Sequence, residues 1–352
     1  MRLVDVSDFD FDLPESAIAL RPAEPRDSAR LLCVGQDLER GLSDHHVHDL
    51  PDLLDPGDLL VINDTKVIPA ALKATRPARP QGGGGDVALT VNLHKRTGPD
   101  GWRAFIRPAK RLRQGDTVIF ANDFAATVMD IHRGGDVALQ FDRRDAALDQ
   151  AVALHGGMPL PPYIARQRPA DDRDETDYQT VYADEPGSVA APTAGLHFTP
   201  ELFDRLNARG VTIARLTLHV GAGTFLPVKS DRTEDHIMHS EWYEVTDAVD
   251  QAIRAAKQGG GRVIAVGTTA LRALEASGGQ AQSGETDIFI TPGYRFKVVD
   301  GLMTNFHLPK STLFMLVSAL AGVDMMHAAY RHAIQTGYRF YSYGDSSLLW
   351  RR

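Results

Sequence analysis

The stretch Leu59-Leu60-Val61-Ile62-Asn63-Asp64-Thr65-Lys66 decides how the chain is organised. Four consecutive apolar residues after the turn-forming segment 51–57 are typical of a strand that is buried in a sheet. The polar residues 63–66 follow at the end of that strand, where α/β folds often keep ligand contacts. Beyond residue 66 the pattern of the chain changes, so this stretch marks a border between two domains.

Residues 66–142 contain short runs rich in β-forming residues, separated by turns with glycine and aspartate. The close spacing of these runs, without a helical period between them, predicts a small antiparallel β-barrel. The expected strands are 87–93, 102–106, 117–120, 125–130 and 137–141.

After residue 145 strands and helices alternate, which predicts a layered α/β domain with largely parallel strands. The expected strands outside the barrel are 31–34, 59–62, 211–220, 262–266 and 287–290, and the expected helices are 199–210, 246–257, one starting after 267–269, 311–321 and 324–335. The fold class is therefore a layered α/β main domain, residues 1–65 and 143–352, interrupted by an inserted small antiparallel β-barrel domain, residues 66–142.

The composition is that of a soluble globular protein, with 43% hydrophobic and 24% charged residues. The single cysteine, Cys33, cannot form a disulfide within the chain, which fits a reducing compartment. The longest apolar run, 313–322, is much shorter than the roughly 20 residues needed to span a bilayer. We therefore expect a cytoplasmic protein without a membrane partner. A monomer is the expected state, although the sequence leaves the oligomeric state open.

The net charge of −8 argues against a nucleic-acid partner, but the charge is unevenly distributed. Between residues 71 and 113 ten basic residues face only two acidic ones, Asp86 and Asp100. Such an excess is typical of a phosphate-binding surface, although a solvated basic surface would look the same. The basic residues are Lys73, Arg76, Arg79, Lys95, Arg96, Arg103, Arg107, Lys110, Arg111 and Arg113.

The segment from His219 to Tyr243 combines a glycine loop, Gly221-Ala222-Gly223-Thr224, with histidines and a glutamate. Glycines let the backbone approach a ligand closely, and imidazole and carboxylate groups carry protons. The loop lacks the third glycine of a dinucleotide fingerprint, so a simple tight turn is an alternative. His236, His239 and Glu241 could hold a metal with His197 or His219, but the H-E-x-x-H order of zinc proteases is absent.

Two further features could contact a ligand. Gly267-Thr268-Thr269 stands at the end of a predicted strand, where backbone N–H groups and hydroxyls become available, unless it is only a capped turn. The segments 292–296 and 304–309 mix aromatic residues with Arg, Asn and His, which can stack on a nucleobase or simply pack in turns.

Taken together, these motifs resemble the S-adenosylmethionine:tRNA ribosyltransferase-isomerase family of queuosine biosynthesis over almost the whole chain. The resemblance rests on the order and spacing of many segments rather than on any single one. They are F-D-F-D-L-P from Phe9, L-R-P from Leu20, L-L-V-I-N-D-T-K-V-I-P-A from Leu59, P-L-P-P-Y-I from Pro159, Y-Q-T-V-Y-A from Tyr178, G-S-V-A-A-P-T-A-G-L-H-F-T from Gly187, the segment 219–243, G-T-T from Gly267, F-I-T-P-G-Y-R-F from Phe289, T-N-F-H-L-P-K-S-T-L from Thr304 and Y-S-Y-G-D from Tyr341.

The resemblance implies a two-domain enzyme that moves and isomerises the ribosyl group of S-adenosylmethionine onto 7-aminomethyl-7-deazaguanine at the wobble position of tRNA. The product would be epoxyqueuosine-tRNA, with release of adenine and methionine and without a metal. The sulfonium acidifies the C5′ hydrogens, so a base could start the reaction, and a general acid would help adenine to leave.

On this resemblance we assign three sets of expected site residues. The expected catalytic residues are His219, His239, Glu241, His197 and Asp64. Those expected at S-adenosylmethionine are Gly221, Gly223, Thr224, Gly267, Thr268 and Thr269. Those expected at tRNA are Lys66, Arg107, Lys110, Arg111 and Arg113.

The chain departs from the family pattern at two places. Ala71 stands where the family commonly has arginine, and Ser346-Ser347 replace the usual Ala-Met near the end. Three other classes remain as alternatives: an S-adenosylmethionine-dependent methyltransferase, a non-catalytic RNA-binding module and a zinc hydrolase.

Overall fold

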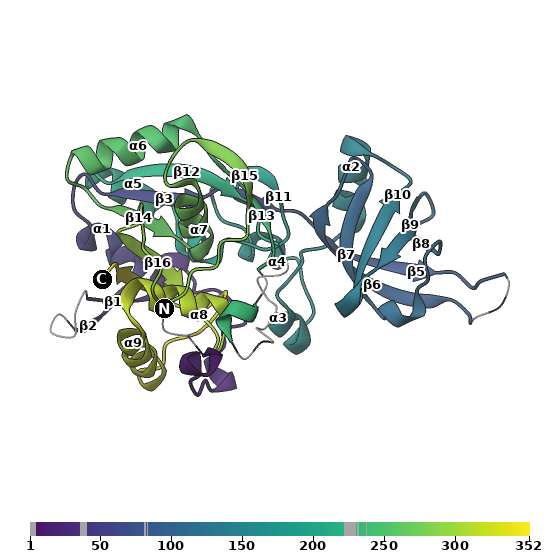
Figure 1. Cartoon of the computed structure of the whole chain (residues 1–352), viewed down its shortest axis with the longest axis horizontal. Coiled ribbons are helices and arrows are strands. Elements are labelled where there is room, and N and C mark those ends of the chain that lie inside the picture. The colour runs from purple at the N-terminus through teal and green to yellow at the C-terminus, as the bar shows by residue number, and fades with distance from the viewer. Residues whose placement is uncertain are drawn as a thin grey trace. The chain divides into compact units, whose positions relative to one another are not determined.

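The computed structural model describes residues 5–35, 41–80, 82, 84–221, 230, 232–236 and 238–352. The chain divides into two compact units, each containing segments that are distant in sequence (Figure 1). Unit 1 comprises Met1–Lys66, Thr176–Glu185 and Ala191–Arg352, and unit 2 comprises Val67–Glu175 and Pro186–Ala190. Gly223 and Thr224, two of the expected ligand contacts, lie outside the described residues.

Unit 1 is built around a nine-stranded mixed sheet with the order β15-β13-β12-β3-β14-β16-β17-β1-β2. The four neighbours β12, β3, β14 and β16 run parallel to one another in its centre. The strands are β1 (Arg30–Val34), β2 (Leu42–His46), β3 (Leu59–Asn63), β12 (Thr212–Leu218), β13 (Glu241–Val245), β14 (Val263–Val266), β15 (Gln282–Thr286), β16 (Gly301–Asn305) and β17 (Ser346–Trp350). A separate two-stranded sheet consists of β4 (Thr65–Val67) and β11 (Glu185–Ser188), each of which has residues in both units.

The central strands are buried on both faces, as their unbroken apolar sequences predict. All five residues of β3 are buried, and alternate residues contact different layers. Leu60 and Ile62 join a core that includes Leu202 and Leu206 of α5, while α6 and α7 pack against β3, β12 and β14. The α-helices of the described residues are α1 (Leu50–Leu53), α2 (Asp145–His155), α3 (Pro162–Gln167), α4 (Asp174–Asp177), α5 (Pro200–Ala208), α6 (Asp247–Gln258), α7 (Thr268–Ser277), α8 (Thr312–Ala321) and α9 (Val323–Gln335).

Side-chain caps fix where two of these helices begin. The Thr199 hydroxyl accepts a hydrogen bond from the Leu202 amide at the start of α5, and the Ser311 hydroxyl accepts one from the Phe314 amide at the start of α8, each at 3.1 Å. Among the described residues, no single helix is long and apolar enough to cross a membrane. The pair α8 and α9 would qualify only together, and the two helices meet at a bend of 115°.

Unit 2 contains a closed six-stranded barrel with the order β10-β7-β6-β5-β8-β9, and every recorded strand pair in it is antiparallel. The strands are β5 (Ala71–Arg76), β6 (Val87–Arg96), β7 (Gly101–Arg107), β8 (Thr117–Ala121), β9 (Phe124–Ile131) and β10 (Asp136–Phe141). Alternate residues such as Leu89, Val91 and Leu93 fill its interior. Helix α2 follows β10, and the ring of its His155 stacks on Phe124.

The predicted α/β domain with an inserted antiparallel barrel is confirmed, but two details of the sequence analysis are wrong. The large sheet is mixed rather than largely parallel, because β13 pairs antiparallel with β12 and β15, β17 with β16, and β2 with β1. The strand expected at 287–290 lies instead at Gln282–Thr286, where pairing with β13 fixes its position.

The barrel strands end at Phe141, close to the predicted border at residue 142, but the compact unit that contains them continues through α2 and α3 to Glu175. Ala71, which replaces the arginine common in the family, begins β5 opposite Asn92 of β6. The position therefore belongs to the barrel.

Candidate active site

The carboxyl ends of the four parallel strands meet at one edge of the central sheet. We call the residues 63–65, 218–221, 267–269 and 305–307, which follow or end β3, β12, β14 and β16, the carboxyl edge. Open α/β sheets bind ligands at this edge, because strands end there and leave backbone groups and side chains free to face a crevice.

Asn63 ties three of these strand ends together. Its side-chain amide donates to the Leu218 carbonyl at 2.9 Å and to the Thr269 hydroxyl at 3.2 Å. Its side-chain oxygen accepts from the Leu218 and Thr65 amides at 3.0 and 3.2 Å. The side chain is fully buried, so these bonds hold β3, β12 and α7 in a fixed arrangement.

His219 stands directly after β12 and is held on two sides. Its Nδ1 lies 2.8 Å from the Thr65 hydroxyl, and its ring stacks on Trp242 of β13 at a centroid distance of 5.1 Å. Burial lowers the pKa of His219 below its ordinary value, because burial penalises the charged imidazolium. The ring is therefore neutral at neutral pH.

Asp64 lies between Asn63 and Thr65 and receives a hydrogen bond of 2.7 Å from the Thr217 hydroxyl. Burial raises the pKa of the Asp64 carboxyl, and the nearby Glu185 adds to this effect. The side chain remains half-buried rather than fully buried. Asp64 consequently keeps its proton to a higher pH than an exposed aspartate does.

Glu241 at the start of β13 is buried and forms an ion pair with Arg272 of α7. Its other oxygen accepts a 2.9 Å hydrogen bond from the amide of Gly221, the first residue of the glycine loop. Arg272 also donates to the Ile288 carbonyl at 3.3 Å. Both Glu241 oxygens are thus engaged in positioning neighbouring groups.

The start of α7 contributes the glycine and threonines expected at the ligand. Gly267 has a φ of +89°, a backbone conformation that residues with a side chain rarely adopt. Its amide donates a hydrogen bond to the Met303 carbonyl at 2.8 Å. Thr268 and Thr269 are both buried. These three residues lie at the carboxyl edge with Asp64 and His219, as predicted by their position after a strand.

His197 belongs to the short 3-10 helix η7 (Thr193–His197), next to the end of β16. Its Nε2 lies 3.2 Å from the Asn305 side-chain amide, whose oxygen accepts from the Thr193 hydroxyl at 2.9 Å. Burial lowers the pKa of His197 to about 4. The histidine is neutral and locked in a buried network.

His239 is placed differently from the other expected catalytic residues. Its side chain is exposed and lies close enough to His236 to act on that histidine electrostatically. Within the described parts of the chain, the side chains that could gather around a metal ion are His46, His48 and Asp49, which include none of the residues selected from the sequence.

The basic residues expected at tRNA are exposed. Arg107 ends β7, Lys110 and Arg111 lie in the 3-10 helix η5 (Ala109–Arg111), Arg113 follows it, and Lys66 lies in β4. Other members of the basic run are neutralised within unit 2, because Arg79, Arg96 and Arg103 pair with Asp116, Asp149 and Asp136. Fewer unpaired positive charges therefore lie on unit 2 than the count of basic residues in the sequence indicates.

Several residues that shape the carboxyl edge were not selected from the sequence. They are Asn63, Thr65, Thr217, Arg272 and Asn305. Asn63 and Thr65 flank Asp64 directly after a buried strand, which was an available signal. No local pattern reveals that Arg272 pairs with a glutamate 31 positions away.

Comparison with known proteins identifies the family. A family model described as a queuosine biosynthesis protein matches residues 6–349. A Maricaulis maris protein named S-adenosylmethionine:tRNA ribosyltransferase-isomerase is 63% identical over 352 residues, which cover 99% of each chain. A Rhizobium etli protein of the same name is 57% identical over 357 residues, which cover 98% of each chain.

A solved structure supports the same assignment. The crystal structure of S-adenosylmethionine tRNA ribosyltransferase from Thermotoga maritima is 33% identical and aligns with a TM-score of 0.54, covering 97% of this chain and 99% of that one. The predicted resemblance is thereby confirmed: the chain belongs to the queuosine biosynthesis family whose curated members are named S-adenosylmethionine:tRNA ribosyltransferase-isomerase.

Proposed function

We propose that this protein transfers and isomerises the ribosyl moiety of S-adenosylmethionine onto 7-aminomethyl-7-deazaguanine at the wobble position of tRNA. The products are epoxyqueuosine-tRNA, adenine and methionine. The enzyme acts as a monomer in the cytoplasm and uses S-adenosylmethionine as a co-substrate without a metal. Family membership over almost the full length of the chain supports this reaction.

The observation that carries the site assignment is the pairing of two proton carriers at the carboxyl edge. The ends of β3 and β12 hold these groups together: Thr65, after β3, bonds His219, and Thr217, in β12, bonds Asp64. Burial moves their pKa values in opposite directions, down for the histidine and up for the aspartate. Titratable groups separated in this way are typical of a general base and a general acid in one site.

In this proposal His219 removes the proton next to the sulfonium. The tautomer in which Nδ1 donates to the Thr65 hydroxyl leaves the lone pair on Nε2, and the stacked Trp242 fixes the ring plane. Asp64 supplies the proton that assists departure of adenine. His197 supports the edge as a buried neutral group. His239, whose side chain is exposed, and Glu241, which is paired with Arg272, are the further candidates for proton transfer.

The glycine loop and the start of α7 would hold the co-substrate. Gly221 and Gly267 expose backbone without side chains, and Thr268 and Thr269 add hydroxyls beside them. Gly223 and Thr224 are proposed contacts on the basis of their loop. Arg107, Lys110, Arg111, Arg113 and Lys66 are proposed contacts to the tRNA backbone.

The test incubates the protein with S-adenosylmethionine and tRNA that carries the deazaguanine precursor, followed by chromatography of the small molecules. We expect adenine and methionine to appear only when that tRNA is present. Release of S-adenosylhomocysteine would instead identify a methyltransferase. Salt-sensitive RNA binding without product would identify a binding module.

A further inference from the structure

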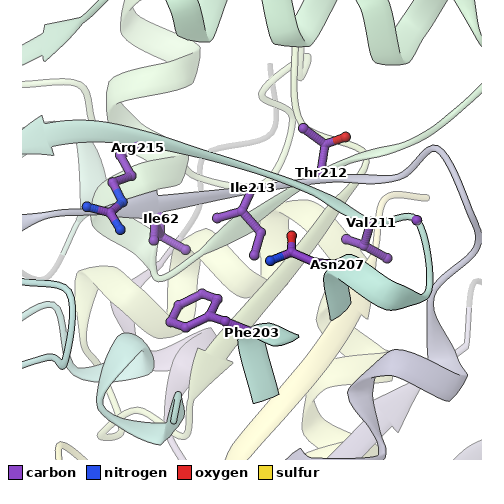
Figure 2. Close-up of a pocket in the computed structure, with 8 residues that line it drawn as sticks. Ile62, Phe203, Asn207, Val211, Thr212, Ile213 and Arg215 are labelled. Atoms are coloured by element: carbon purple, nitrogen blue, oxygen red, sulfur yellow. The ribbon is translucent and has the colours of Figure 1, made fainter. Parts of the chain in front are cut away.

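A groove on unit 1 runs along β12 from Gly210, before the amino end of the strand, to Arg215, two residues before the Thr217 that bonds Asp64. A hollow of about 600 Å³ lies between α5 and β12, and a second one of about 370 Å³ continues it past Phe203 and Arg215. Figure 2 shows Phe203 and Asn207 projecting from α5 toward the side of β12 that carries Ile213 and Arg215. We call these four residues the α5–β12 groove.

Strand geometry connects this groove with the proposed catalytic groups. Successive side chains of a strand alternate between its faces, so Arg215 and Thr217 point to the same side of β12, and His219 follows at the strand's end. Thr217 bonds Asp64, and the Arg215 charge itself acts on the Asp64 carboxyl. Four residue-to-residue steps along the chain lead from Arg215 to His219, which is roughly 13 Å in a strand.

The side chains of the groove are suited to a nucleobase. The Phe203 ring is half-exposed and is supported from behind by Tyr182 and Phe198, at ring distances of 5.6 and 5.2 Å. The Arg215 guanidinium is exposed and forms no hydrogen bond or ion pair with any residue that the structure describes. The exposed Asn207 amide offers both donors and an acceptor. Unstacked bases are recognised by aromatic rings, guanidinium planes and such amides.

We propose that the α5–β12 groove binds a second, unstacked nucleotide of the RNA substrate, a few positions along the strand from the nucleotide that reacts. The base lies against Phe203 and Arg215, and Asn207 hydrogen-bonds its edge. The proposal rests on the proposed function, because a polynucleotide is the substrate that can occupy the groove and the carboxyl edge at once. The groove therefore contributes RNA affinity and sequence preference rather than chemistry.

The test measures binding of a fluorescent anticodon stem-loop RNA to the full chain by anisotropy, without S-adenosylmethionine. The variants are Arg215→Ala, Asn207→Ala and Phe203→Leu, which keeps apolar volume in the partly buried position. The control is Arg205→Ala, because Arg205 lies on the same helix, is exposed and does not line the groove. We expect Arg215→Ala and Phe203→Leu each to weaken binding about tenfold or more, and Arg205→Ala to change it less than twofold.

A second measurement separates this proposal from the proposed function. Stem-loops with single 4-thiouridine substitutions are irradiated, and the crosslinked peptide is identified by mass spectrometry. Crosslinks from one position to peptides of α5 or β12 support the proposal, whether or not adenine is released in the activity assay. Wild-type affinity in both the Arg215 and Phe203 variants, or crosslinks confined to other peptides, would overturn it while leaving adenine release untouched.

Discussion

Replacing Arg272 by methionine should destabilise unit 1 strongly, because the arginine neutralises a glutamate that water does not reach. The side chains of Arg272 and Glu241 are only 6% and 4% exposed. Removing one partner of such a pair deprives the other of its counter-charge, which costs about 3–5 kcal/mol. For a unit of this size that corresponds to a fall in melting temperature of roughly 6–20 °C.

The assay is a double-mutant cycle followed by thermal unfolding and circular dichroism. Its members are Arg272→Met, Glu241→Gln and the double variant, in which no buried charge remains and the glutamine can still accept from the Gly221 amide. We expect the loss of unfolding free energy in the double variant to be smaller than the sum of the two single-variant losses by about 0.5–3 kcal/mol. Arg254→Met is the control, because the Arg254 side chain on α6 is exposed and ion pairs of exposed arginines contribute little to stability.

Two results would refute this reasoning. The first is a change of less than about 1 kcal/mol in Arg272→Met, below the cost of a buried unpaired charge. The second is strict additivity, which would show that the two side chains do not act on each other. The same variants also bear on catalysis: if the double variant folds and retains turnover, Glu241 positions the loop and carries no proton.

Three further predictions follow from the same structure. Asp64→Asn should lower turnover about 100-fold or more, while its stability at pH 7 should equal or exceed that of the wild type. Because the pKa of Asp64 is raised in the folded state, the wild type should lose stability relative to the variant as the pH rises from below 4 through that pKa. Parallel melting experiments at several pH values measure this difference. Gly195→Ala should destabilise by about 1–3 kcal/mol, since its Cβ would lie 2.0 Å from the Tyr182 hydroxyl oxygen, and adding Tyr182→Phe should restore part of the loss in a melting experiment. Replacing together the four exposed basic residues Arg107, Lys110, Arg111 and Arg113 of unit 2 should weaken tRNA binding. The slope of the logarithm of the binding constant against the logarithm of the salt concentration should fall in magnitude by about 3. Arg96→Ala, which removes an arginine paired with Asp149, should change this slope less.

The central strands could be predicted from sequence because an unbroken run of apolar residues indicates a strand that is buried on both faces. The run 59–62 and the run 262–266 both became buried parallel strands of the sheet centre. The edge strands could not be predicted in this way. Gln282–Thr286 is a polar sequence that becomes β15 only because it pairs with β13, whereas the more apolar 287–290 forms a loop whose Ile288 carbonyl accepts from Arg272.

The barrel shows the same limit at β5. Ala71–Arg76 alternates buried and exposed residues, but it is short and is followed at once by Pro77, so its sequence does not stand out. Its place is fixed by pairing with β6 and β8, which is information held by other segments. Candidate residues at strand ends were therefore predictable, while the partners that orient them, such as Arg272 for Glu241, were not.

A single physical cause prepares both proposed proton carriers at the carboxyl edge. Partial burial penalises the charged form of each group, so it lowers the pKa of His219 and raises that of Asp64. In the proposed mechanism the lowered pKa keeps His219 unprotonated, so that it can accept a proton. The raised pKa lets Asp64 hold a proton to a higher pH than an exposed aspartate does. Moving either side chain to an exposed position would return its pKa to the ordinary value. The hydrogen bonds from Thr65 and Thr217 hold His219 and Asp64 in these partly buried positions. The Thr217 bond by itself lowers the pKa of Asp64, so the raised pKa reflects the larger opposing effect of burial.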